Sequence, residues 1–138
     1  MASIIREIVI EADPVDAWDA LRDFGAIHER LARGFVVGTT MDAKNSRTVR
    51  FVTGAVAKED LIGCDDELRR IAYSVVDGPL QFTHHNSSAQ VFAFGDRQTR
   101  LVWSTDVLPD EIAPRVQEFM EHGLNAMKTT LEGGGTER

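Results

Sequence analysis

Three charged or titratable residues lie in segments where polar and apolar residues alternate, the pattern typical of half-buried strands. Arg47 and Glu59 occupy two neighbouring segments of this kind, and His85 occupies a later one. A carboxylate or an imidazole can move a proton, and a guanidinium can stabilise the oxygen of an enolate. These three residues are therefore candidate catalytic groups.

A purely structural role explains the same residues. Arg47 and Glu59 on adjacent buried strands must pair, because an unpaired buried charge is strongly unfavourable. We favour this interpretation, a cross-strand salt bridge, over direct contact with a ligand. Tyr73 and Trp103 each combine a large ring with one polar atom, which suits both a core residue and the wall of a pocket.

Two adjacent histidines, His84 and His85, form the most unusual short motif of the sequence. Neighbouring residues on a strand point to opposite faces, so the two rings cannot hold one metal ion together. We therefore expect neither a metal nor a cofactor. His85 remains either a general base or a hydrogen-bonded residue on a cavity wall, the second interpretation being favoured.

The first third of the chain predicts one strand and two short helices. Residues 3–12 alternate as in a half-buried strand, and Asp13-Pro14 then provides a capping side chain and a suitable first helical residue. Val15, Trp18 and Leu21 recur at helical spacing, so we expect Trp18 to face the core. A second short helix is expected at about residues 26–32.

The rest of the chain predicts an antiparallel meander followed by a helix. Turn residues separate successive strand-like segments, and short links between neighbours indicate antiparallel pairing. The expected strands are 35–39, 47–53, 56–64, 68–76, 82–94 and 98–107. Residues 111–132 carry apolar side chains at helical spacing and predict one long amphipathic helix with an irregular start, with Phe119 and Leu124 in the core.

Strand alternation also predicts which side chains share a face. If the more apolar set of each strand faces inward and no bulge intervenes, five residues point to one side of the sheet. These residues are Arg47, Glu59, Tyr73, His85 and Trp103. A strongly curved sheet around a single helix tends to leave a gap, which can become a ligand cavity.

The order of elements, Asp13-Pro14 followed by Trp18, Arg47 with Glu59-Asp60-Leu61, and Leu101-Val102-Trp103 carry a family resemblance. The stretch Asp106-Val107-Leu108-Pro109 before the long helix supports it. Over about residues 3–132 the chain resembles the START-like, Bet v 1-like (SRPBCC) superfamily, in its bacterial polyketide cyclase/dehydrase branch. The resemblance implies an α+β helix-grip fold: a curved antiparallel sheet of about seven strands wrapped on a long C-terminal helix, with two short helices after the first strand.

The resemblance also implies an internal cavity for a small hydrophobic ligand that is lipid, polyketide or isoprenoid-like. The alternative is a polyketide cyclase, aromatase or dehydratase using the same cavity, and a third option is an interaction protein that uses the outer face of the sheet. Whether the protein is an enzyme stays open. The residues expected to line the cavity are Phe35, Arg47, Phe51, Glu59, Tyr73, His85, Trp103, Phe119, Gly123 and Met127.

Composition restricts the partners. The 138 residues include 15 Lys and Arg against 22 Asp and Glu, a net charge of −7, which argues against nucleic acid. No apolar run approaches the roughly 20 residues that span a bilayer. We expect one domain over residues 1–132, a flexible tail over 133–138, and a cytoplasmic protein that is a monomer or a weak homodimer and binds a small apolar molecule.

Overall fold

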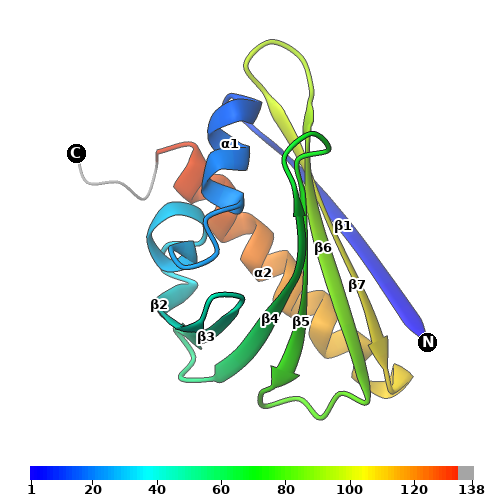
Figure 1. Ribbon diagram of the computed structural model, residues 1–138. Coiled ribbons are helices and arrows are strands. Elements are labelled where there is room, and N and C mark those ends of the chain that lie inside the picture. The colour runs from blue at the N-terminus through cyan, green and yellow to red at the C-terminus, as the bar shows by residue number, and fades with distance from the viewer. Residues whose placement is uncertain (134–138) are drawn as a thin grey trace.

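Seven antiparallel strands form one curved sheet around a long C-terminal helix (Figure 1) in the computed structural model, which describes residues 1–133. The sheet order is β1-β7-β6-β5-β4-β3-β2. The expected tail, residues 133–138, lies outside the described residues apart from Gly133. The elements are β1 (Ala2–Ile10), α1 (Pro14–Leu21), η1 (Ile27–Leu31), β2 (Val36–Ala43), β3 (Ser46–Phe51), β4 (Val56–Asp65), β5 (Arg70–Asp77), β6 (His84–Ala93), β7 (Thr99–Leu108), η2 (Asp110–Ile112) and α2 (Ala113–Leu131).

Alternation along the strands places the apolar set inside, as predicted. Every second residue of β7 is buried, and Arg47, Val49 and Phe51 of β3 are buried together. Register shifts interrupt the β2–β3 and β4–β5 pairs. Arg47 and Glu59 still face each other in register across β3 and β4, so these bulges leave both residues on the buried face.

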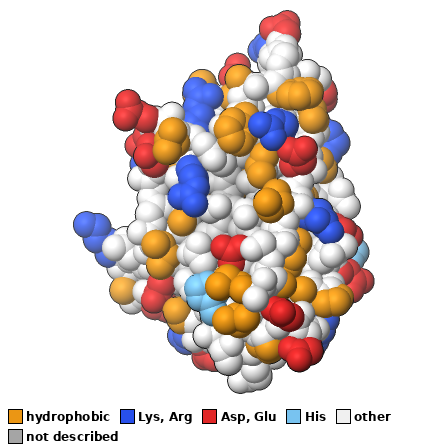
Figure 2. All heavy atoms as spheres, turned by 90° about the vertical axis from the view of Figure 1, so that its right-hand side faces the viewer, with side chains coloured by type: hydrophobic (Ala, Val, Ile, Leu, Met, Phe, Trp, Pro, Cys, Tyr) orange, Lys and Arg blue, Asp and Glu red, His pale blue; other side chains and the backbone are white. Residues whose placement is uncertain are grey.

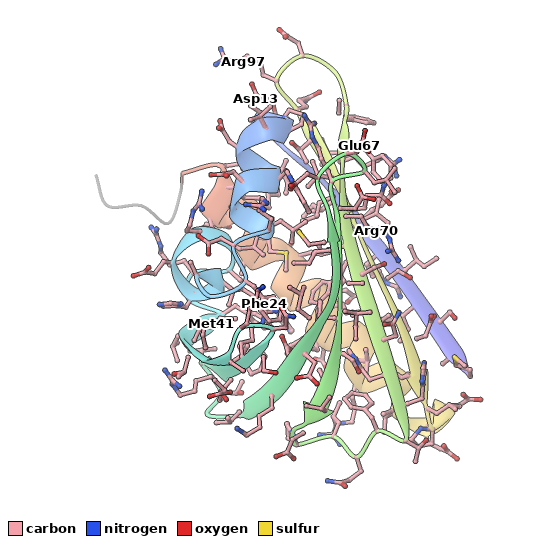
Figure 3. The ribbon with its side chains drawn as sticks, viewed as in Figure 1. Asp13, Phe24, Met41, Glu67, Arg70 and Arg97 are labelled. Carbon is pink, nitrogen blue, oxygen red and sulfur yellow. The ribbon has the colours of Figure 1, made fainter. Side chains whose placement is uncertain are left out.

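The two short helices after β1 form as predicted, with shorter bounds for the second. The Asp13 carboxylate, at the start of α1 (Figure 3), accepts a hydrogen bond from the Val15 amide at 3.2 Å. Trp18 is buried as expected, but Val15 is 60% exposed and does not belong to the core stripe. η1 is a single turn, closed by the Ala32 amide on the Ile27 carbonyl.

The long helix α2 starts at Ala113, two residues later than expected. The short turn η2 precedes it, and Pro114 occupies the first turn of α2, where a missing N–H costs no hydrogen bond. Leu124 is buried as predicted, with 4% exposed. The expectation that Phe119 is a core residue is wrong, because its side chain is 36% exposed.

The helix packs closely against the sheet at Gly123. A β-carbon at this position would lie 2.8 Å from Cζ3 of Trp103 and 3.3 Å from Cε2 of Phe35. Real β-carbons do not approach other atoms as closely as 2.8 Å, so the absent side chain is what allows this contact. Gly123 is therefore a site of close helix–sheet packing.

The surface of the molecule is mixed in character. Basic, acidic and hydrophobic side chains are interspersed on the face that Figure 2 shows, so no single charge type dominates that face. Across the described residues, none of the helices has both the length and the apolar character that a bilayer crossing requires.

The contact at Gly123 gives a stability prediction. Gly123→Ala should lower the free energy of unfolding by up to about 2 kcal/mol, since overpacking typically costs about 1–3 kcal/mol and the gain in helix propensity offsets about 1. Asn125→Ala, on the exposed side of the same helix, should instead stabilise by about 0.5 kcal/mol. Urea denaturation measures both. A Gly123→Ala protein at least as stable as the parent would show that α2 and Trp103 are not in tight contact.

Candidate functional site

A cavity of about 220 Å³ lies between the concave face of the sheet and the first half of α2. It opens to solvent where the β3–β4 turn, the β5–β6 loop and the start of α2 meet, because Val52, Pro79 and Arg115 line it and are exposed. Most of the wall is apolar. The lining residues are Phe35, Phe51, Val52, Thr53, Ala55, Ala57, Glu59, Tyr73, Val75, Pro79, Leu80, Phe82, His85, Ser87, Trp103, Thr105, Arg115, Val116, Phe119 and Met120.

A second, smaller cavity of about 40 Å³ adjoins the first on the side of α1 and η1. Arg47 and Met127 line this inner cavity, and His85 lines the outer one. The residues common to both walls are Phe35, Phe51, Glu59, Tyr73, Trp103 and Phe119. Nine of the ten side chains predicted to line a cavity therefore do so.

Gly123 is the exception among the predicted lining residues. It lines neither cavity, because the side chains of Trp103 and Phe35 pack directly against it. The interpretation of Gly123 as part of a pocket is corrected to a role in helix–sheet packing. A larger side chain there would displace Trp103 rather than fill the cavity.

Three phenylalanines that line both cavities contact one another. The ring centroids of Phe35 and Phe119 lie 5.0 Å apart, those of Phe51 and Phe119 lie 5.2 Å apart, and those of Phe35 and Phe51 lie 5.5 Å apart. Such spacings are those of favourable edge and tilted aromatic contacts. The cluster gives the cavity an aromatic wall on the side of the helix and β3.

Arg47 and Glu59 form the buried cross-strand pair that the sequence analysis favoured. Nη2 and Nε of Arg47 lie 2.7 Å and 2.9 Å from Oε1 of Glu59, and Nη1 donates to the Phe24 carbonyl at 2.8 Å. The guanidinium also lies 3.7 Å from the ring centroid of Phe24, a residue of the α1–η1 segment that Figure 3 labels. The two residues are only 5% and 6% exposed, so their charges compensate each other out of water.

The second carboxylate oxygen of Glu59 remains available to a ligand. The hydrogen bond from Arg47 Nε and the ion-pair contact from Nη2 both end on Oε1 of this carboxylate. Among the described residues, these contacts with Arg47 leave Oε2 without a partner, and Glu59 lines both cavities. The inner wall thus offers one hydrogen-bond acceptor.

A chain of polar side chains crosses the sheet below the cavity. The indole N–H of Trp103 donates to the Tyr73 hydroxyl and to Oγ of Ser87, each at 3.1 Å, and Ser87 Oγ lies 2.6 Å from Oγ1 of Thr105. Burial first, and the negative charge of Glu59 second, raise the pKa of Tyr73 to about 12. Tyr73 is therefore a neutral phenol at physiological pH and does not act as a base.

His85 is oriented by the backbone of the neighbouring strand. Its Nδ1 accepts a hydrogen bond from the Val75 amide at 3.0 Å, so the ring proton resides on Nε2. Burial first, and the neighbouring His84 second, lower the pKa of His85 to about 4. The ring is neutral near pH 7 with its basic nitrogen occupied. Of the two interpretations of His85, general base or hydrogen-bonded residue on the cavity wall, this geometry agrees with the second, and Nε2–H is free to donate.

The described residues contain no cluster of three His, Cys, Asp or Glu side chains that could hold a metal ion.

Sequence patterns missed the part of the cavity wall that comes from loops and from the start of α2. Ala55, Leu80 and Phe82 lie in loops, and Arg115 lies where the amphipathic pattern indicates solvent. The apolar residues in otherwise polar loops were the available signal.

Comparisons with known proteins agree with this architecture. The family described as polyketide cyclase/dehydrase and lipid transport matches residues 1–132. No curated protein sequence matches the chain.

Solved structures share the fold. The protein XoxI from Bacillus cereus is 19% identical, with a TM-score of 0.83 over 99% of this chain and 100% of that one. A START superfamily protein from Mycobacterium smegmatis is 17% identical, with a TM-score of 0.72 over 96% and 95%. Norcoclaurine synthase from Thalictrum flavum, solved with dopamine and hydroxybenzaldehyde, is 19% identical, with a TM-score of 0.73 over 99% and 89%.

The buried pair gives a matched comparison of two Arg–Glu contacts. Arg47→Met leaves the Glu59 charge buried without a partner and should cost about 3–5 kcal/mol of unfolding free energy. Arg100→Met breaks a contact of the same 2.7 Å length to Glu7, but on the partly exposed β1–β7 surface, and should cost no more than about 1 kcal/mol. Equal losses in urea denaturation would contradict the structural role of the buried pair.

The state of His85 can be read directly by nuclear magnetic resonance. Imidazole ¹⁵N spectra, assigned with a His85→Gln variant, should show a neutral ring protonated on Nε2 from pH 7.5 to about pH 5, with a midpoint near 4. The unfolded chain binds this proton near pH 6.5 whereas the folded protein does not, so His85 reduces stability as the pH falls from about 6.5 to about 4. A midpoint near 6.5, or a proton on Nδ1, would refute the assignment.

Proposed function

Because the chain belongs to the polyketide cyclase/dehydrase and lipid transport family, we propose that it binds a compact, largely apolar small molecule between α2 and the sheet. The observation that carries this proposal is the cavity of about 220 Å³, open at one end and walled mostly by apolar side chains. A concave apolar site with a few fixed polar groups is the usual form of a small-molecule pocket.

The size of the cavity restricts the ligand. An engineered apolar cavity of about 150 Å³ holds one benzene molecule. The present cavity, at about 220 Å³, suits a molecule with one or two rings and does not hold the acyl chains of a two-chain lipid. Of the expected ligand classes, a small polyketide-like or isoprenoid-like molecule fits best.

The polar groups of the wall indicate the substituents of such a ligand. Glu59 Oε2 accepts a hydrogen bond, and His85 Nε2–H donates one. They lie on strands β4 and β6, on either side of β5, where Val75 pairs with Glu59 and donates its amide to His85. A ring system carrying a hydroxyl and a carbonyl at separate positions would satisfy both groups.

Binding alone accounts for this interior better than catalysis. Tyr73 is a neutral phenol, the basic nitrogen of His85 is occupied, and one oxygen of Glu59 is committed to Arg47. The second candidate function is a cyclase, aromatase or dehydratase. One observation favours it, since Glu59 Oε2 is a carboxylate oxygen on the cavity wall and could accept a proton from an enolisable ligand.

Filling the cavity tests the proposal. Val116→Phe adds a ring to the cavity wall and should weaken binding of 6-hydroxy-2-acetonaphthone at least about tenfold by isothermal titration calorimetry, because ligand and side chain compete for one space. Val15→Phe makes the same change on the exposed face of α1 and should leave the affinity unchanged.

A second cavity-filling variant keeps the test valid if Val116→Phe does not fold. Ala55→Leu narrows the same cavity from the β3–β4 turn and should also weaken binding. Circular dichroism confirms that each variant is folded. Parent-like affinity in both folded filling variants, or no binding by the parent protein, would overturn the proposal.

A further inference from the structure

Arg115 is a cation at the open end of the cavity. It lies in the first turn of α2, lines the cavity and is exposed to solvent. Within residues 1–133 it makes no ion pair or hydrogen bond with another side chain. Among the described residues, neither Glu111 nor Glu118, one turn before and one turn after it, forms an ion pair with Arg115. The guanidinium therefore remains available to a molecule seated in the cavity.

The opposite end of the cavity does not favour an anion. Arg47 is fully engaged, with its three nitrogens directed at Glu59 and the Phe24 carbonyl. The pair it forms with Glu59 has no net charge, and the free oxygen of Glu59 carries negative charge toward the cavity. Among the described residues that line the outer cavity, Arg115 is the sole Lys or Arg.

The rim beside Arg115 is apolar. Val52 is 62% exposed, Phe119 is 36% exposed, and both line the cavity. A ligand whose apolar body fills the cavity would cover these side chains and bring its outer end to the guanidinium. The arrangement is polarised: an acceptor inside, an apolar body in the middle, and a cation at the mouth.

We propose that the molecule bound in this cavity is an organic anion, with its apolar body inside and a carboxylate or similar anionic group at the mouth against Arg115. This inference rests on the proposed function and specifies its ligand class. A guanidinium matches the two oxygens of a carboxylate with parallel hydrogen bonds. The anionic group stays in contact with water, so its desolvation cost is small.

The net negative charge of the protein makes a cation at the cavity mouth important for binding an anionic ligand. With 15 basic and 22 acidic side chains, the molecule as a whole repels anions. A local cation at the mouth counters this repulsion where the ligand enters. The interaction is exposed, so it should weaken with added salt.

Isothermal titration calorimetry with two nearly isosteric ligands tests the inference. One ligand is the anion 2-naphthoate, and the other is the neutral 2-naphthamide. The parent protein should bind 2-naphthoate more tightly. Arg115→Gln should weaken 2-naphthoate about three- to fivefold, the scale of an ion pair at an exposed site, and leave 2-naphthamide unchanged. Arg97→Gln removes the same charge from the β6–β7 turn, far from the start of α2 (Figures 1 and 3), and should change neither affinity.

The outcomes separate this inference from the function on which it rests. If the parent binds 2-naphthamide as tightly as 2-naphthoate, or if Arg115→Gln affects both ligands equally or neither, the anionic ligand is refuted while the apolar cavity site stands. If the parent binds neither ligand, both proposals fail. Loss of 2-naphthoate affinity with added sodium chloride in the parent, but not in Arg115→Gln, would support the ion pair at the mouth.

Discussion

The contact between Trp103 and Gly123 determines where the helix meets the sheet, and the cavity follows from it. Two hydrogen bonds from the indole N–H hold the Trp103 ring, and its edge lies where the β-carbon of residue 123 would otherwise be. All helix residues that line the larger cavity precede this contact, namely Arg115, Val116, Phe119 and Met120. The helix thus closes the fold at its C-terminal half and leaves a space beneath its N-terminal half.

The interior of that space is fixed before any ligand arrives. Arg47 is held by Glu59 and the Phe24 carbonyl, His85 by the Val75 amide, and Tyr73 by Trp103. Polar groups held in this way need little reorganisation on binding, so a ligand of the right shape loses less free energy to ordering the site. Of Glu59, Tyr73 and His85, the same contacts leave only the second carboxylate oxygen of Glu59 as a base without a partner among the described residues.

The sequence predicts the sheet face well because burial on one side imposes a period of two on each strand. Arg47, Glu59 and Trp103 could be placed on the cavity side from alternation alone, and the bulges in β4–β5 do not turn Glu59 outward. Contacts made by irregular backbone have no such period. The Phe24 carbonyl that receives Arg47 therefore could not be predicted, and the loop residues at the cavity mouth had only their apolar character as a signal. Nor could alternation show that the Val75 amide occupies Nδ1 of His85.

We propose that a ligand binds in the space beneath the first half of α2. Intermolecular nuclear Overhauser effects between bound 6-hydroxy-2-acetonaphthone and ¹³C-labelled methyl groups test it most directly. The structure requires contacts to the methyl groups of Val116 and Met120, which line the cavity, and none to Val15 on the exposed face of α1. Contacts confined to methyl groups outside the cavity, such as those of Val15 or of the exposed Ile5, would contradict the account.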